Sequence, residues 1–138
     1  MQQREIIVPE AMKLIPERIG YAPGVKIGGF LFCSGQIGRT PDLEVVVDPE
    51  AQFVAAWENL KAVLHEGGCS FDDIVELTTY HVDIAVHLQL YKEVRDRYLP
   101  RAQSTWTAIG ISALAHPAML LELKCIAIAP QAHERPGP

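Results

Sequence analysis

Short apolar runs separated by glycine pairs, prolines and acidic turns predict a chain that alternates strands and helices. The first two strands lie within residues 25–35, where apolar residues stand on either side of Gly28-Gly29. Such a pair favours a hairpin turn, because glycine reaches positive φ without strain. The preceding segment, residues 8–18, contains Pro9 and Pro16 and is predicted to form a loop.

Two helices are predicted from apolar residues at helical spacing. Asp48 is suited to cap the first helix, Pro49 fits its first position, and Gly67-Gly68 stops it. The apolar stripe of this helix comprises Phe53, Trp57, Leu60 and Leu64. A second helix is predicted over roughly 84–98, with Asp83 as its cap.

Further strands are predicted at residues 74–82, 105–111 and 119–129. The order β-β-α-β-α-β-β, with four main strands, predicts an α+β fold with two helices on one face of a mixed sheet. The last segment is apolar at nearly every position, so both of its faces should be buried. Because two helices cover only one face, we expect another copy of the chain to cover the other. Residues 130–138, rich in proline, should form a flexible tail.

Composition narrows the class of protein. The 138 residues fit one domain, and the net charge of −5 with scattered basic residues argues against nucleic acid and anionic membranes as partners. No apolar run is long enough to span a bilayer, and the start lacks the apolar region of a signal peptide. The three cysteines have no metal-site spacing and indicate buried thiols in a reducing compartment. We therefore expect a cytoplasmic protein.

One acidic residue is the strongest candidate for chemistry. Glu122 interrupts an apolar run in the middle of the last predicted strand. Burial raises the pKa of a carboxyl group, which suits a general acid or base. The alternative is that Glu122 pairs with a cation or a backbone N–H at a subunit interface. Ser34-Gly35-Gln36 could bind a ligand through exposed N–H groups, or could simply end a strand. The histidines show no metal spacing and phosphate-binding motifs are missing, so we expect no cofactor and no metal.

Several segments, in order, resemble the RidA family, also called YjgF. They are Tyr21–Val25, Phe32–Gly38, Asp48 with Ala51-Gln52 and Glu58–Leu60, Gly67–Val75, Thr107–Ile111 with Ala113-Leu114, and Leu121–Leu123 with Ile126-Ala127. The resemblance covers about residues 17–129 and implies a single RidA-like domain for the chain 1–138. It further implies a chorismate-mutase-like α+β fold and a homotrimer with clefts between subunits.

The resemblance also implies an activity and its residues. Well-known family members hydrolyse reactive imines and enamines, such as 2-aminoacrylate, to 2-keto acids and ammonia. In them a glutamate on the last strand handles the water, and a tyrosine and a serine line the cleft. Tyr21, Ser34 and Glu122 match these positions.

The family arginine that holds the substrate carboxylate has no match in this sequence. Its position falls on Trp106, which offers a large apolar face and one N–H. We therefore expect Trp106 to bind a flatter or more apolar substrate by stacking. Arg101, five residues upstream, is a less favoured alternative that could reach in from the loop. A shifted alignment would place the uncharged Gln103 there instead.

Two functions follow from these residues. The first is hydrolysis of a small imine or enamine in an intersubunit cleft, with an altered substrate range. The alternative is a trimer that binds a small metabolite, as a regulatory module without deaminase activity. Ribonuclease activity, attributed to some relatives, is disfavoured by the negative charge.

Overall fold

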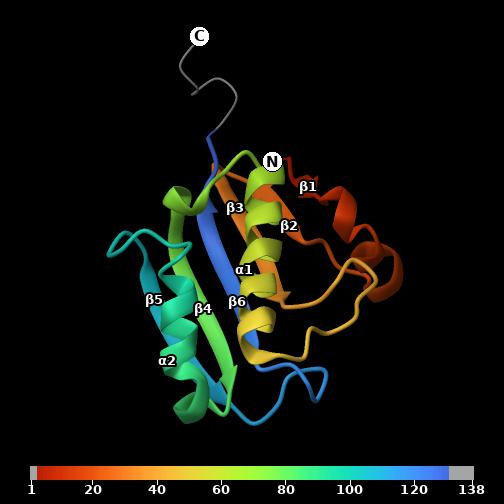
Figure 1. Ribbon diagram of the computed structural model, residues 1–138. Coiled ribbons are helices and arrows are strands. Elements are labelled where there is room, and N and C mark those ends of the chain that lie inside the picture. The colour runs from red at the N-terminus through yellow and green to blue at the C-terminus, as the bar shows by residue number, and fades with distance from the viewer. Residues whose placement is uncertain (1–2, 131–138) are drawn as a thin grey trace.

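The computed structural model describes residues 3–130, which form one mixed sheet with helices on one side (Figure 1). Six strands lie in the order β1-β2-β3-β6-β4-β5. Their bounds are Glu5–Ile7 for β1, Gly24–Ile27 for β2, Phe30–Ile37 for β3, Ile74–Val82 for β4, Thr105–Ile111 for β5 and Leu121–Ile128 for β6. Only the β4–β5 pair is parallel. The predicted α+β fold with a mixed sheet is therefore confirmed.

Both long helices pack on the same face of the sheet, as predicted. Helix α1 (Pro49–Glu66) packs against β3 and β6, and α2 (Ile84–Arg95) lies over β4 and β5 (Figure 1). Asp48 caps α1 by accepting a hydrogen bond from the N–H of Ala51 at 3.0 Å. The predicted apolar stripe of α1 is fully buried against the sheet and forms the centre of the core.

The turns follow the local rules of the sequence in most places. Gly28 and Gly29 both adopt positive φ, as the predicted hairpin between β2 and β3 requires. Helix α2 differs from the prediction, because it ends at Arg95 and continues only as turns to residue 98. Asp83 precedes α2 but forms no side-chain cap, because its backbone is left-handed with φ of 54°.

The N-terminal segment is more ordered than predicted. Residues 8–18 do not form a plain loop: a 3-10 turn covers Glu10–Met12 and a π-helical turn covers Ile15–Ile19. Pro16 fits at the start of the second turn, where a missing N–H is tolerated. The edge strand β1 was not predicted, because three residues give no period that a sequence reading can detect. The predicted tail lies, apart from Pro130, outside the described residues.

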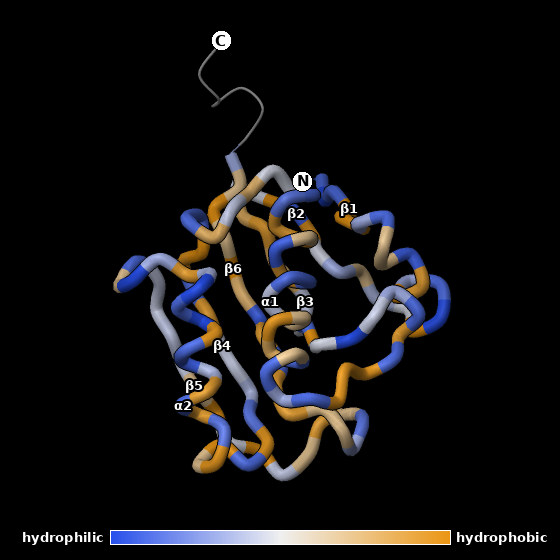
Figure 2. Tube along the Cα trace, in the orientation of Figure 1, coloured by the Kyte–Doolittle hydropathy of each residue, from blue (hydrophilic) through white to orange (hydrophobic). Residues whose placement is uncertain are grey.

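One face of the sheet is left without helices, and we call it the open face. Along β6, Leu121, Leu123, Cys125 and Ala127 are buried beneath the helices, while the residues between them point to the open face. The hydrophobic run of β6 crosses the middle of the sheet (Figure 2). Phe32 is 44% exposed and Ile128 is 52% exposed on this face. A single chain thus leaves this face of β6 uncovered, and its burial by another copy stays a prediction.

A buried amide joins the start of α1 to two loops. The Gln52 side chain is fully buried, and its nitrogen donates to the carbonyls of Val46 at 2.9 Å and Ala118 at 2.8 Å. Its oxygen accepts from the N–H of Leu120 at 2.7 Å. Gln52 thus satisfies backbone groups on both sides of the entrance to β6.

We predict that Gln52→Leu lowers the free energy of unfolding by about 2–4 kcal/mol, because it leaves three backbone groups buried without partners. Gln89→Leu on the exposed side of α2 is the matched control and should change it by less than about 0.5 kcal/mol. Urea unfolding followed by circular dichroism measures both. Equal effects of the two variants would contradict the structural role given to Gln52.

Candidate active site

Glu122 lies on the open face, in the middle of β6. It pairs in register with Ile37 of β3 and Tyr80 of β4, and its carboxyl group rests against Gly35. A side chain at Gly35 would collide with this carboxyl group, so glycine is required for the arrangement. The β3–β6 register shifts between Cys33 and Gln36, and such irregularities commonly redirect side chains at functional sites.

Burial raises the pKa of the Glu122 carboxyl group above its ordinary value of 4.5. The positive charges of Arg39 and Lys124 act in the opposite direction and lower it. A carboxyl group with a raised pKa is suited both to accept and to donate a proton during a reaction.

Arg39 joins this site from the loop that follows β3. Its Nη2 donates a hydrogen bond to the Tyr21 hydroxyl oxygen at 2.7 Å, and its charge acts on Glu122. Arg39 lies two residues beyond Ile37, the β3 residue that pairs with Glu122. Arg39 is thus connected to Tyr21 by a hydrogen bond and to Glu122 by its charge.

Ser34 lies in β3 beside Gly35, but its hydroxyl group is engaged. It donates to the carbonyl of Ala22 at 2.5 Å and so ties β3 to the segment that carries Tyr21. The hydroxyl oxygen still has lone pairs that can accept a hydrogen bond from a ligand. The predicted cleft residues Tyr21, Ser34 and Glu122 therefore lie on one side of one chain.

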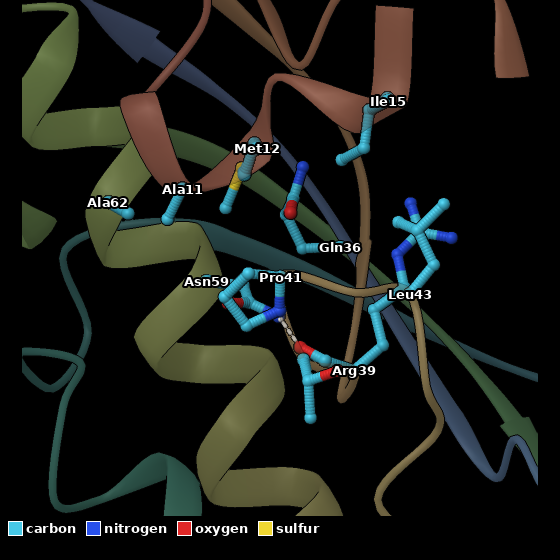
Figure 3. Close-up of a pocket in the computed structure, with 10 residues that line it drawn as sticks. Ala11, Met12, Ile15, Gln36, Arg39, Pro41, Leu43, Asn59 and Ala62 are labelled. Atoms are coloured by element: carbon cyan, nitrogen blue, oxygen red, sulfur yellow. Dashed lines mark hydrogen bonds between the residues drawn. The ribbon is translucent and has the colours of Figure 1, made fainter. Parts of the chain in front are cut away.

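Helix α1 holds the Arg39 loop in place (Figure 3). The Asn59 amide donates to the carbonyls of Ile37 at 2.8 Å and Arg39 at 3.0 Å. Gly38 lies so close to the backbone of Gln52 that no side chain would fit there. A cavity of about 50 Å³ lies between this loop and the N-terminal turns, bordered by Met12, Gln36 and Arg39 among others.

The structure does not bring Trp106 and Arg101 to Glu122. Trp106 pairs in register with the buried Leu77 and faces α2, on the opposite side of the sheet. Arg101 lies near Trp106 at a surface depression of about 260 Å³ that Arg95 also borders. One chain therefore cannot place Trp106 and Glu122 on the same small molecule.

Trp106 is held by contacts within its own chain. Its indole N–H donates to the Thr79 hydroxyl at 2.9 Å, and its ring stacks on Tyr91 with centroids 5.8 Å apart. The Arg95 guanidinium lies 5.0 Å from its ring centroid. Trp106 is nevertheless 36% exposed at the edge strand β5, so one part of the ring stays accessible.

The sequence reading missed Arg39. The residue follows the Ser34–Gly38 segment that carried the resemblance, but its relevance depends on the register that pairs Ile37 with Glu122. Only a prediction of strand pairing could have found it. Asn59 belonged to a segment of the resemblance without a role, and the structure gives it one as the clamp of this loop.

The remaining candidates for chemistry form no metal site. Within residues 3–130, no three His, Cys, Asp or Glu side chains come together as metal ligands. Cys33, Cys69 and Cys125 are buried, as predicted, although the strand pairing places Cys33 opposite Cys125. Burial lowers the pKa of His81, which shares a 2.7 Å hydrogen bond with the Thr79 hydroxyl. No helix within the described part of the chain has the length and apolar character to cross a bilayer.

Comparison with known proteins now identifies the family. The family model described as Endoribonuclease L-PSP matches residues 13–129, which include every element from the π-helical turn to β6. The chain belongs to the RidA/YjgF family. The resemblance found in the sequence is thereby confirmed.

Two relatives illustrate the range of the family. The RutC family protein YjgH of Escherichia coli K12 is 30% identical and covers 95% of this chain and 99% of its own length. A solved structure of protein YJGH superposes with a TM-score of 0.85 over 93% of this chain and 98% of that one. The E. coli K12 protein named "Putative reactive intermediate deaminase TdcF" is 30% identical over 82% of this chain and 90% of its own. A crystal structure of E. coli TdcF with bound serine has a TM-score of 0.66, with 29% identity, over 78% of this chain and 87% of that one.

The raised pKa of Glu122 predicts a pH-dependent cost to stability. The folded chain keeps the Glu122 proton at pH values where the unfolded chain has lost it, so stability falls as the pH rises from about 4.5 through the raised pKa. Glu122→Gln removes this dependence. The buried His81 acts with the opposite sign, and comparing the two proteins cancels its contribution.

Urea unfolding between pH 4 and pH 8 measures the effect as the stability of the wild type minus that of Glu122→Gln. We expect this difference to decrease as the pH rises. A difference that does not change with pH would contradict the raised pKa of Glu122.

Proposed function

We propose that the protein hydrolyses a small reactive imine or enamine to a carbonyl compound and ammonia, with Glu122 as the acid–base residue. The observation that carries this proposal is the half-buried carboxyl group that lies against Gly35, with a raised pKa and an arginine nearby. A carboxyl group of this kind can take a proton from water and return it to a leaving nitrogen.

The reaction requires only water as a co-reactant. An enamine first takes a proton from the protonated Glu122 on its carbon and becomes the iminium ion. The water oxygen then forms a bond to the iminium carbon while the Glu122 carboxylate accepts a water proton, which gives a carbinolamine. Glu122 passes this proton to the nitrogen, the C–N bond breaks and ammonia leaves. Glu122 accepts the hydroxyl proton as the C=O group forms, which restores its protonated form.

Two further observations support this activity. The name of the E. coli relative TdcF describes it as a reactive intermediate deaminase, and a TdcF structure holds serine, a small amino acid. Tyr21, Ser34 and Glu122 match the positions of the cleft residues in the resemblance, and they lie on one side of the chain. We extend the activity to this chain on that basis.

We propose that the working unit is a homotrimer with the site between subunits. The open face exposes large apolar side chains, which include Phe30, Phe32 and Ile128. Such a surface favours association with a second copy. Assembly would also provide a route by which Trp106 and Arg101 of one copy approach Glu122 of another, because β5 is the exposed edge strand of the sheet.

We propose that the substrate range differs from that of family members with the arginine. Trp106 occupies that position, and its contacts with Thr79, Tyr91 and Arg95 commit much of its ring to its own chain. Trp106 therefore provides an apolar ring edge at β5, whereas an arginine there would provide a guanidinium that binds a carboxylate with two hydrogen bonds.

Two substitutions test the role of Glu122. We expect Glu122→Gln to reduce ammonia release from imines, generated by an amino-acid oxidase, by at least about 100-fold, because it removes the group that moves the proton. Gly35→Ala should lower the rate as well, because its methyl group displaces the Glu122 carboxyl group while the strand stays intact. Arg97→Gln, on an exposed ion pair with Glu50, serves as the matched control and should keep the full rate.

The outcomes separate two functions. Full activity in Glu122→Gln would contradict the proposed role of this residue. Saturable binding of a small metabolite without ammonia release in the wild type would favour the alternative, a trimer that binds a metabolite as a regulatory module.

A further inference from the structure

The cavity between the N-terminal turns, the loop after β3 and helix α1 has the size and lining of a small-molecule site (Figure 3). Its volume is about 50 Å³. A water-sized group needs roughly 10–15 Å³ of such space, so the cavity has room for about three to five heavy atoms. Most of the lining is apolar and comes from segments far apart in the sequence: Ala11, Met12, Ile15, Pro41, Leu43 and Ala62.

One buried polar side chain borders this cavity with an unused acceptor. Gln36 is only 3% exposed, and its amide nitrogen donates to the Ser34 carbonyl at 3.2 Å. The amide oxygen has no hydrogen-bond partner among residues 3–130. In that range, the polar side-chain atoms that lack a partner and are completely covered belong to Trp57, His81 and Tyr91. The Gln36 oxygen is therefore not completely covered and can accept a hydrogen bond from a molecule in the cavity.

Arg39 borders the same cavity and provides donors. Its Nη2 donates to the Tyr21 hydroxyl at 2.7 Å, and no carboxylate among residues 3–130 forms an ion pair with its guanidinium. Several of its five N–H groups therefore stay available. The positive charge of Arg39 disfavours a cation in the cavity, and the lone pairs of the Gln36 oxygen disfavour a carboxylate beside it.

We propose that this cavity binds the carboxamide group of a small neutral molecule, at a site separate from Glu122. A carboxamide carries an N–H donor and a C=O acceptor on one carbon and has no charge. Its N–H donates to the Gln36 oxygen, and its C=O accepts from the Arg39 guanidinium. A short alkyl chain on the same carbon lies among the apolar side chains of the lining.

The walls of the cavity are fixed by hydrogen bonds within the chain. Asn59 of α1 donates to the carbonyls of Ile37 at 2.8 Å and Arg39 at 3.0 Å. The N–H of Leu43 donates to the Thr40 carbonyl at 2.8 Å, which closes the turn that carries Leu43. A site with fixed walls loses less entropy when a ligand binds.

The cavity and the candidate active site lie on different sides of the sheet. Asn59 and Ala62 of α1 border the cavity, whereas the Glu122 side chain lies on the open face. Binding in the cavity therefore does not depend on the proposed hydrolysis, and it can be measured in a protein that releases no ammonia.

NMR titration of the isotope-labelled full chain with two probes tests the proposal. The probes are propanamide and propanoate, which have the same shape and differ in that a carboxylate replaces the carboxamide. The variants are Gln36→Leu, which removes the acceptor, and Ala62→Leu, which fills the cavity. Ala85→Leu, at an exposed position of α2, is the matched control. Thermal melting shows whether each variant is folded.

We expect propanamide to shift the backbone N–H signals of residues around the cavity, such as Met12, Gln36 and Ala62, in a saturable way. Propanoate should bind at least about tenfold more weakly, because it has no N–H to offer to the Gln36 oxygen. Gln36→Leu should weaken propanamide binding by a similar factor, and Ala62→Leu should abolish it. Ala85→Leu should bind both probes as the wild type does.

Four results would overturn the proposal: no saturable shifts with propanamide, equal affinity for the two probes, unchanged propanamide binding in folded Ala62→Leu, or shifts centred on Glu122 or Trp106 instead of the cavity. If Gln36→Leu does not fold, Ala62→Leu and the comparison of the two probes still decide the matter.

Discussion

The site of this protein depends on an asymmetry of the sheet, because both long helices pack on one face only. That face receives the apolar stripe of α1 and the alternate residues of β6, and together they form the core. The open face is left with partly exposed aromatic and aliphatic side chains and with Glu122 among them. Glu122 can lie in the middle of an apolar strand because its side chain points away from the core. Gly35 has no side chain and therefore leaves space for the Glu122 carboxyl group. The apolar side chains exposed on the open face favour association with further copies of the chain.

Two opposing influences act on the pKa of Glu122 at the open face. Desolvation favours the protonated form of Glu122, and the cationic side chains of Arg39 and Lys124 favour the ionised form. Arg39 is placed by the end of β3, by the Asn59 clamp and by the tight contact of Gly38 with α1. Helix α1 thus fixes the loop that carries Arg39, and the positive charge of Arg39 lowers the pKa of Glu122 on the open face.

Local signals in the sequence were sufficient for the hairpin, both helices and the main strands. The glycine pair, the Asp48 cap and the apolar spacing of α1 depend only on neighbouring residues, and the structure shows each of them. The position of Glu122 within an apolar strand was likewise visible. Features that depend on pairing between distant segments could not be predicted from the sequence. They are β1, the pairing of Ile37 with Glu122, and the face of the sheet on which Trp106 lies. The sequence position of Trp106 leaves open whether it lines a cleft or packs into the core, and strand register places it beneath α2.

The central claim is that the Glu122 carboxyl group, held against Gly35 on the open face, moves the proton in the hydrolysis of a small imine. The rate of ammonia release by the wild type and by Glu122→Gln, measured under identical conditions, tests it most directly. We predict that the wild type releases ammonia and that the variant loses at least about 100-fold of this rate. Equal rates in the two proteins would contradict the account.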